Sequence, residues 1–170
     1  MKWLRFAVQG IDAFNEIIEK TIRWLILFIM SITIYHVVLR YFFAAPTIWA
    51  YELSGLLFAP LWLLVGGYVL LKDIHVRMDI FYRRLTPRKQ AIIDLATYTF
   101  FFFYCGLILI YGWEYSWLSF IRQKRSARSL WRPILWPFDA AIPVGAGLIL
   151  LAGMAKYIRD LYTAITGRRL

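Results

Sequence analysis

Two long apolar runs joined by a short connection, 21–43 and 48–71, constrain the fold of this chain more than any other feature. Arg40 lies near the end of the first run, and Glu52 lies near the start of the second. A charge within or beside a segment that crosses a bilayer costs free energy, so each of these residues needs a partner or a task. The pattern indicates a membrane hairpin and excludes a loop of a water-soluble domain.

Two further apolar stretches follow, and all four are long enough to cross a bilayer, which takes about 20 helical residues. We expect membrane spans at 21–43, 48–71, 91–113 and 136–154, each with tryptophan or tyrosine near at least one end. Hydrophobic residues make up 61% of the sequence, well above their share in water-soluble domains. The sequence therefore predicts an all-α integral membrane protein with four transmembrane helices in a single domain, 1–170.

The segment before the first span has a different pattern. Residues 1–20 place apolar side chains on one face of a helix and charged side chains on the other. Such a helix lies flat in the membrane interface, so we expect a separate amphipathic interfacial helix there. A similar pattern at 73–84 predicts a second amphipathic segment. Thr86 followed by Pro87 predicts the start of the third long helix.

Basic residues indicate how the chain is oriented. They are more numerous in the N-terminal segment, in the loop after the second span and in the tail than on the opposite side. By the positive-inside rule, both termini are expected in the cytoplasm. The loop between the third and fourth spans is an exception, because it is basic although it would face outward. This predicts a contact with a partner or with lipid headgroups through Arg122, Lys124, Arg125, Arg128 and Arg132.

A formal net charge of +10 raises the question of nucleic-acid binding. The basic residues lie between apolar runs and form no stripe on a water-soluble face. Phospholipids with anionic headgroups explain the same charge more simply, so we expect no nucleic-acid partner.

The first hairpin allows two interpretations of its charges. Arg40 and Glu52 should lie at similar depth, which favours a partly buried ion pair. Alternatively, Arg40 extends to the headgroups while Glu52 caps a helix N-terminus. Both interpretations give these residues a structural role.

The two histidines suggest metal or haem binding only weakly. His75 and Asp79 are one helical turn apart, which fits a hydrogen-bonded surface pair, but two ligands cannot fill a zinc site. His36 lies near the outer end of the first span, about 20 Å from the inner end where His75 falls, so the two cannot ligate one iron. We expect no metal and no cofactor.

Catalytic chemistry is not indicated either. The chain has one cysteine, Cys105, which can form neither an internal disulfide nor a redox pair. Ser116 and Ser119 have no evident histidine or acid partner in the sequence, and no glycine-rich phosphate loop occurs. We expect that this protein is not an enzyme.

Several motifs in a fixed order carry a resemblance to a known family. They are RYFF at 40–43, PTIWAYEL at 46–53, GGYVLLKDIHVRMD at 66–79, the Thr-Pro pair at 86–87, and SxxSxWRPILWP at 126–137. Together they resemble the small membrane subunit of the TRAP transporters, the tripartite ATP-independent periplasmic transporters of bacteria and archaea. The resemblance covers nearly the whole chain.

The resemblance implies a role in sodium-coupled uptake of organic acids across the bacterial inner membrane. In this family a periplasmic substrate-binding protein delivers the substrate to two membrane subunits. The large one carries the substrate and sodium sites, and the small one supports it as a heterodimer. The basic outer loop is a candidate surface for the binding protein or for lipid. The residues that match the family pattern, and are expected to hold the hairpin and its partner contacts, are Arg40, Trp49, Glu52, His75 and Asp79.

Two other functions remain open from the residues alone. The chain would be a membrane anchor subunit of a respiratory or other multisubunit complex if it carried cofactor ligands or a quinone pocket. It would be a small exporter, acting as a homodimer, if a polar stripe ran along one helix face. The sequence shows neither feature.

Overall fold

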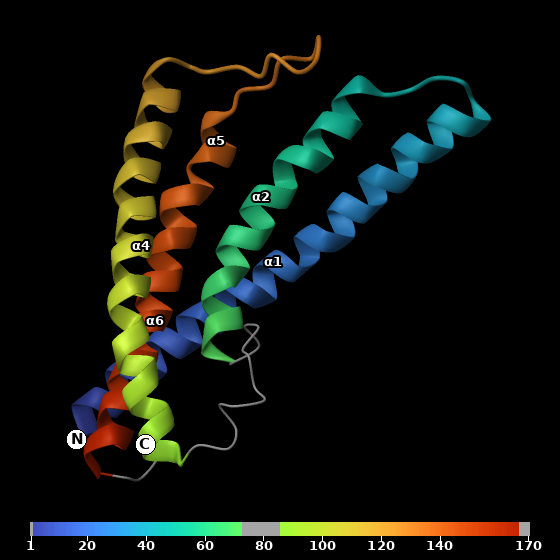
Figure 1. Cartoon of the computed structure of the whole chain (residues 1–170). Helices are drawn as coiled ribbons and strands as arrows, with labels where there is room; N and C mark the ends of the chain where they lie inside the picture. Colours follow the sequence, from blue (N-terminus) through green and yellow to red (C-terminus); the bar gives the residue numbers. More distant parts are fainter. Residues whose placement is uncertain (1, 73–85, 167–170) are drawn as a thin grey trace.

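The computed structural model describes residues 2–72 and 86–166, and this part of the chain is all-helical (Figure 1). Its helices are α1 (Lys2–Phe42), α2 (Ile48–Leu71), α4 (Pro87–Ile121), the short α5 (Trp136–Asp139) and α6 (Ala141–Thr166). The β-structure in these residues is an isolated bridge between Arg125 and Ile134. The expected amphipathic segment at 73–84 lies outside the described residues, and so do His75 and Asp79.

Three helices are long and apolar enough to cross a membrane: Gly10–Phe42, Ile48–Leu71 and Trp136–Thr163. The all-helical fold is confirmed in the described residues, and these three helices are candidate membrane spans by their length and composition. The fourth expected span falls in α4, which is 35 residues long. The described residues of α4 hold no uninterrupted stretch that is both long and apolar enough to be placed with these three helices. A fourth crossing by α4 therefore stays a prediction.

Helix α1 is continuous across the boundary that the sequence predicts near residue 20. No glycine or proline lies between residues 11 and 42 to end the helix, and Arg23 pairs with Glu19 one turn away at 2.7 Å. The boundary is therefore wrong, while an interfacial position of 2–20 stays a prediction. Forty-one residues span about 60 Å, roughly twice the hydrocarbon core of a bilayer, so α1 must tilt or extend beyond it.

The core of the molecule lies along α6, which packs against both α2 and α4 (Figure 1). Small residues let these helices approach closely, as is common between membrane helices. Ala152 and Ala155 of α6 are completely buried. A Cβ added to Gly145 would lie 2.7 Å from Cβ and 2.8 Å from the carbonyl oxygen of Leu63 on α2, so this contact requires glycine.

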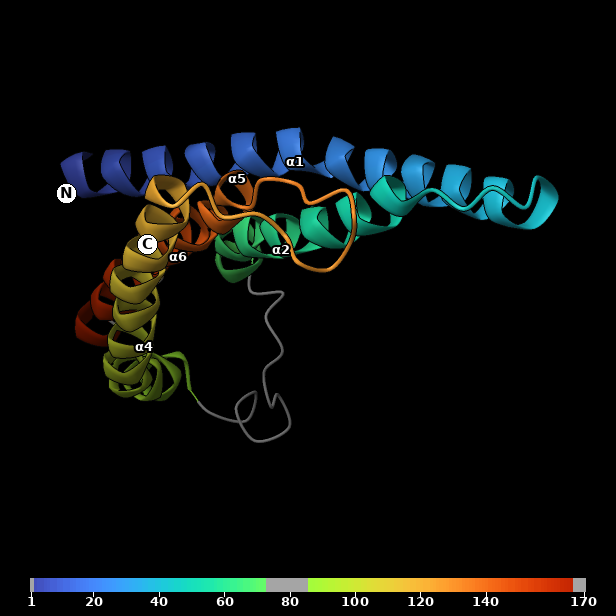
Figure 2. The same cartoon turned by 90° about the horizontal axis from the view of Figure 1, so that it is seen from above.

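Helices α1 and α2 form an arm that diverges from α4 and α6 toward one end of the molecule (Figure 1). Seen from above, α1 extends well past the bundle (Figure 2). The less exposed residues of α1 alternate at spacings of three and four, which is typical of coiled-coil-like packing and marks the face toward α2. They are Ile22, Leu25, Ile29, Ile32, His36 and Leu39. We call 22–42 together with 48–58 the α1–α2 arm.

Polar contacts join the helices at the opposite end. Lys72 at the end of α2 pairs with Glu16 of α1 at 2.7 Å, and Arg159 of α6 pairs with Asp12 of α1. Between these pairs Asn15 is buried against α2 and α6. The first turn of α1 and the last turn of α6 lie at this same end (Figure 1). We call it the terminal end, and we call the opposite end the loop end.

Candidate functional site

The loop end contains a cavity of about 560 Å³ between α1, α2 and the loop 122–135. The two helices of the first hairpin and a loop far along the sequence form its walls. The side chains that concern its chemistry are His36, Arg40, Glu52, Phe58, Arg128 and Ser129. Charged residues expected from the sequence to be important therefore gather around one space.

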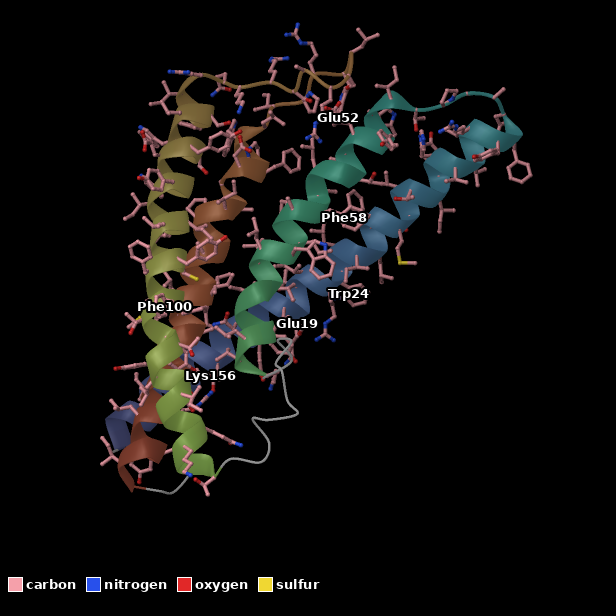
Figure 3. The ribbon with its side chains drawn as sticks, viewed as in Figure 1. Glu19, Trp24, Glu52, Phe58, Phe100 and Lys156 are labelled. Carbon is pink, nitrogen blue, oxygen red and sulfur yellow. The ribbon has the colours of Figure 1, made fainter. Side chains whose placement is uncertain are left out.

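Glu52 is the buried centre of this site, with 7% of its surface exposed. Ser126 donates a hydrogen bond to Oε1 of its carboxylate, and Ser129 donates one to Oε2. A buried carboxylate is stable only when its oxygens are hydrogen-bonded, and here each oxygen has a hydroxyl partner. Glu52 therefore fastens the loop 122–135 to α2 (Figure 3).

The loop is folded locally so that both hydroxyls can reach Glu52. Backbone bonds from Ser126 N to Pro133 O and from Leu135 N to Lys124 O, each 2.9 Å, close it into a narrow hairpin. The serine Oγ atoms also accept bonds from the backbone two residues on, at Arg128 and Trp131. These turns hold the two serines of the SxxS motif in place.

The expected ion pair between Arg40 and Glu52 does not form within the described residues. Both residues line the cavity, but the serines of the loop occupy the carboxylate. The guanidinium of Arg40 lies 5.8 Å from the centre of the neighbouring Tyr41 ring. The alternative, a capping role for Glu52, is also wrong, because Thr47 is the N-cap of α2.

The turn between α1 and α2 is held by side chains on both helices. His36 Nδ1 lies 2.9 Å from Oγ1 of Thr47, and the ring centres of Tyr35 and Trp49 are 6.0 Å apart. Trp49, expected to help hold the hairpin, therefore lies at the α1–α2 seam. The sequence suggests His36 only as a haem ligand, and its contact with Thr47 was not predicted.

The five basic residues expected on the outer loop are all exposed. Lys124 donates a hydrogen bond to the Tyr115 hydroxyl, and its Nζ lies 4.3 Å from the centre of that ring. Arg128 also lines the cavity, and Leu130, two residues on, is 89% exposed. The remaining basic residues, Arg122, Arg125 and Arg132, form no ion pair with a described carboxylate. The loop thus presents positive charge together with an apolar tip.

A second polar cluster joins α4 to α5 and was missed from the sequence. Ser119 donates a hydrogen bond to the Asp139 carboxylate at 2.6 Å, and Ser116 donates one to the Asp139 carbonyl at 2.7 Å. The spacing of three residues between the serines places them on one helix face, which was the available signal. Within 2–72 and 86–166, no group of three or more His, Cys, Asp or Glu side chains is placed to hold a metal.

Comparison with known protein families matches residues 29–163 to the family described as "Tripartite ATP-independent periplasmic transporters, DctQ component". The match runs from the middle of α1 almost to the end of α6 and includes the cavity and the loop 122–135. No curated protein matches the chain.

Proposed function

Since the chain belongs to the DctQ family of tripartite ATP-independent periplasmic transporter components, we propose that it supports a larger transport subunit in the membrane. The family and the apolar helices make it an integral protein of the inner membrane and a transporter component. In the proposed complex the large subunit carries the substrate and the sodium ions. A periplasmic binding protein supplies the substrate, which we take to be an organic acid.

The observation that carries this proposal is the poorly covered α1–α2 arm. In the most apolar window of α1, and likewise in that of α2, 17% of the residues are buried inside the chain, against 44% in α6. Trp24, Ile34 and Tyr41 of α1 are all more than half exposed. Lipid or a protein partner must cover such a surface, and a member of a multicomponent transporter has a partner available.

The positions of the buried polar side chains favour a chain that stabilises a transport subunit over one that carries the substrate itself. In the part of the chain that the structure describes, most of the buried polar side chains lie toward the two ends, and Asn15 lies further in, where it approaches Gly67 of α2 beside Leu148 of α6. A substrate path needs polar groups through the middle of the membrane. The buried polar residues nearer the ends are Lys156 and Thr163 at the terminal end, and Glu52, Ser116, Ser119 and Ser126 at the loop end.

Purification of the tagged chain from its native membranes tests the proposal. The complex is extracted in a mild detergent or into nanodiscs, and its intact mass is measured. We expect a one-to-one complex with a much larger polytopic membrane protein. A homodimer, or a complex with redox subunits, would contradict the proposal.

We further propose that the loop end faces the periplasm, with both termini in the cytoplasm. The loop 122–135 would then meet the binding protein or the outer lipid headgroups through its exposed arginines. The excess of basic residues at the terminal end and the shared position of the helix ends support this orientation.

A further inference from the structure

The cavity at the loop end has a polar part and an apolar part. The polar part contains Arg40, Arg128 and Glu52. Phe58 belongs to the apolar part and lies six residues after Glu52 on α2, about 9 Å along the helix (Figure 3). The aromatic wall is open, because Tyr51 is 73% exposed and Phe58 is 46% exposed. For a chain in a bilayer, such an opening leads to lipid tails.

Two positive groups in the polar part have no carboxylate partner within the described residues. Neither Arg40 nor Arg128 is within ion-pair distance of a described acid. Glu52, the acidic residue that lines the cavity, already accepts hydrogen bonds from Ser126 and Ser129. The guanidinium groups therefore keep their hydrogen-bond donors for a ligand.

The start of α2 adds to this positive character. Ile48, the first residue of the helix, lines the cavity, and Thr47 makes no side-chain capping bond. The backbone N–H groups of a helix's first turn attract anions, and the guanidinium groups of the two arginines that line the same cavity can donate paired hydrogen bonds to phosphate oxygens. The bound group that fits these donors is an anion with several oxygen acceptors.

We propose that this cavity binds the phosphodiester of a phospholipid, with Arg40 and Arg128 on the phosphate and an acyl chain along Phe58. A volume of about 560 Å³ accommodates a headgroup with the first part of a chain. Glu52 lines the same space and disfavours a doubly charged anion, so a singly charged diester fits better than inorganic phosphate. The site goes beyond the supporting role proposed above and does not depend on it.

Phospholipid binding to the purified full-length chain tests the site. The protein is delipidated in an uncharged detergent and titrated with phosphatidylethanolamine, and bound lipid is counted by native mass spectrometry. We expect one tightly held lipid. The double variant R40Q/R128Q should bind it at least about tenfold more weakly, because two charge-assisted contacts are lost. R122Q/R132Q removes the same charge from loop positions outside the cavity and should bind like the unmodified chain.

Several results would overturn the site. If R40Q/R128Q and R122Q/R132Q lose lipid binding equally, the lipid is attracted by the basic surface in general. If both variants bind the lipid as well as the unmodified chain does, Arg40 and Arg128 do not hold the phosphate. If R40Q/R128Q aggregates, R128Q alone gives the same comparison, since Arg128 is an exposed loop residue.

A second comparison separates a lipid from a small anion. Phe58→Ala should weaken lipid binding several-fold, whereas Phe100→Ala, at an exposed phenylalanine of α4, should not. Inorganic phosphate and glycerophosphoethanolamine should displace the lipid only weakly. Displacement at concentrations equal to the lipid's would show a small-anion site instead. The large subunit is scored by co-purification in the same variants. Unchanged lipid binding in R40Q/R128Q with an intact complex overturns this site and leaves the proposed function standing.

Discussion

Glu52 shows how one buried carboxylate can organise an end of a membrane protein. It lies 74 and 77 residues before the serines that bind it, so no local sequence pattern connects them. The sequence identified Glu52 as a residue that needs a partner, because a charge beside an apolar run is costly. It offered Arg40 as that partner, since spacing within a hairpin can be estimated while the fold-back of a distant loop cannot.

Replacing Glu52 by alanine should destabilise the protein. The change leaves the buried Ser126 hydroxyl without its acceptor and releases the loop from α2, at a cost of about 1–3 kcal/mol. Thermal unfolding in detergent measures the effect. Glu114→Ala, at an exposed glutamate of α4, is the matched control and should change the unfolding temperature little. Equal stability of the two variants would show that the Glu52 contacts do not hold the loop.

At the scale of the helices, the ends of a helix agree with the sequence-based prediction where local residues, such as a threonine or a proline, mark them. Helix α2 runs from Ile48 to Leu71 as expected, with Thr47 before it and Lys72 after it. The Thr86–Pro87 start of α4 is also confirmed. The fourth membrane span is expected to end near residue 154, and helix α6 itself continues to Thr166, where its charged residues find partners on other helices. Arg159 pairs with Asp12, and Asp160 accepts a hydrogen bond from Tyr98.

The α2–α6 seam gives a test at this scale. A methyl group added at Gly145 must push Leu63 and its backbone away, so Gly145→Ala should destabilise the protein by about 1–3 kcal/mol. Gly147→Ala lies two residues on in the same helix, where an added Cβ meets nothing within 4 Å. It should be neutral or slightly stabilising, because alanine favours helix over glycine. Thermal unfolding of both variants in one detergent checks the contrast, and a stable G145A protein would argue against the close approach.

At the scale of the whole molecule, the arrangement of the arm could not be read from the sequence. Apolar periodicity identifies a helix that enters a membrane, but it does not say which face meets protein and which meets lipid. The structure shows that the chain itself covers little of α1 and α2 and much of α6. That asymmetry is the basis for placing a partner on the α1–α2 arm.

The proposed orientation can be tested with single cysteines. Leu130→Cys lies at the exposed tip of the loop 122–135 and should react with a membrane-impermeant maleimide in intact spheroplasts. Lys20→Cys lies toward the terminal end and should react only after the membrane is opened. The native Cys105 is buried, which keeps the background low. The reverse labelling pattern would invert the orientation.

Site-specific photo-crosslinking in native membranes can show whether the α1–α2 arm contacts a larger transport subunit. A photoreactive residue is placed at Ile34, which is 59% exposed on α1, or at Ile110, which is 64% exposed on α4. We predict that Ile34 crosslinks to a much larger membrane protein, identified by mass spectrometry as a transport subunit, and that Ile110 does not. A product with only a second copy of the chain, or a large partner captured from Ile110 alone, would contradict the account.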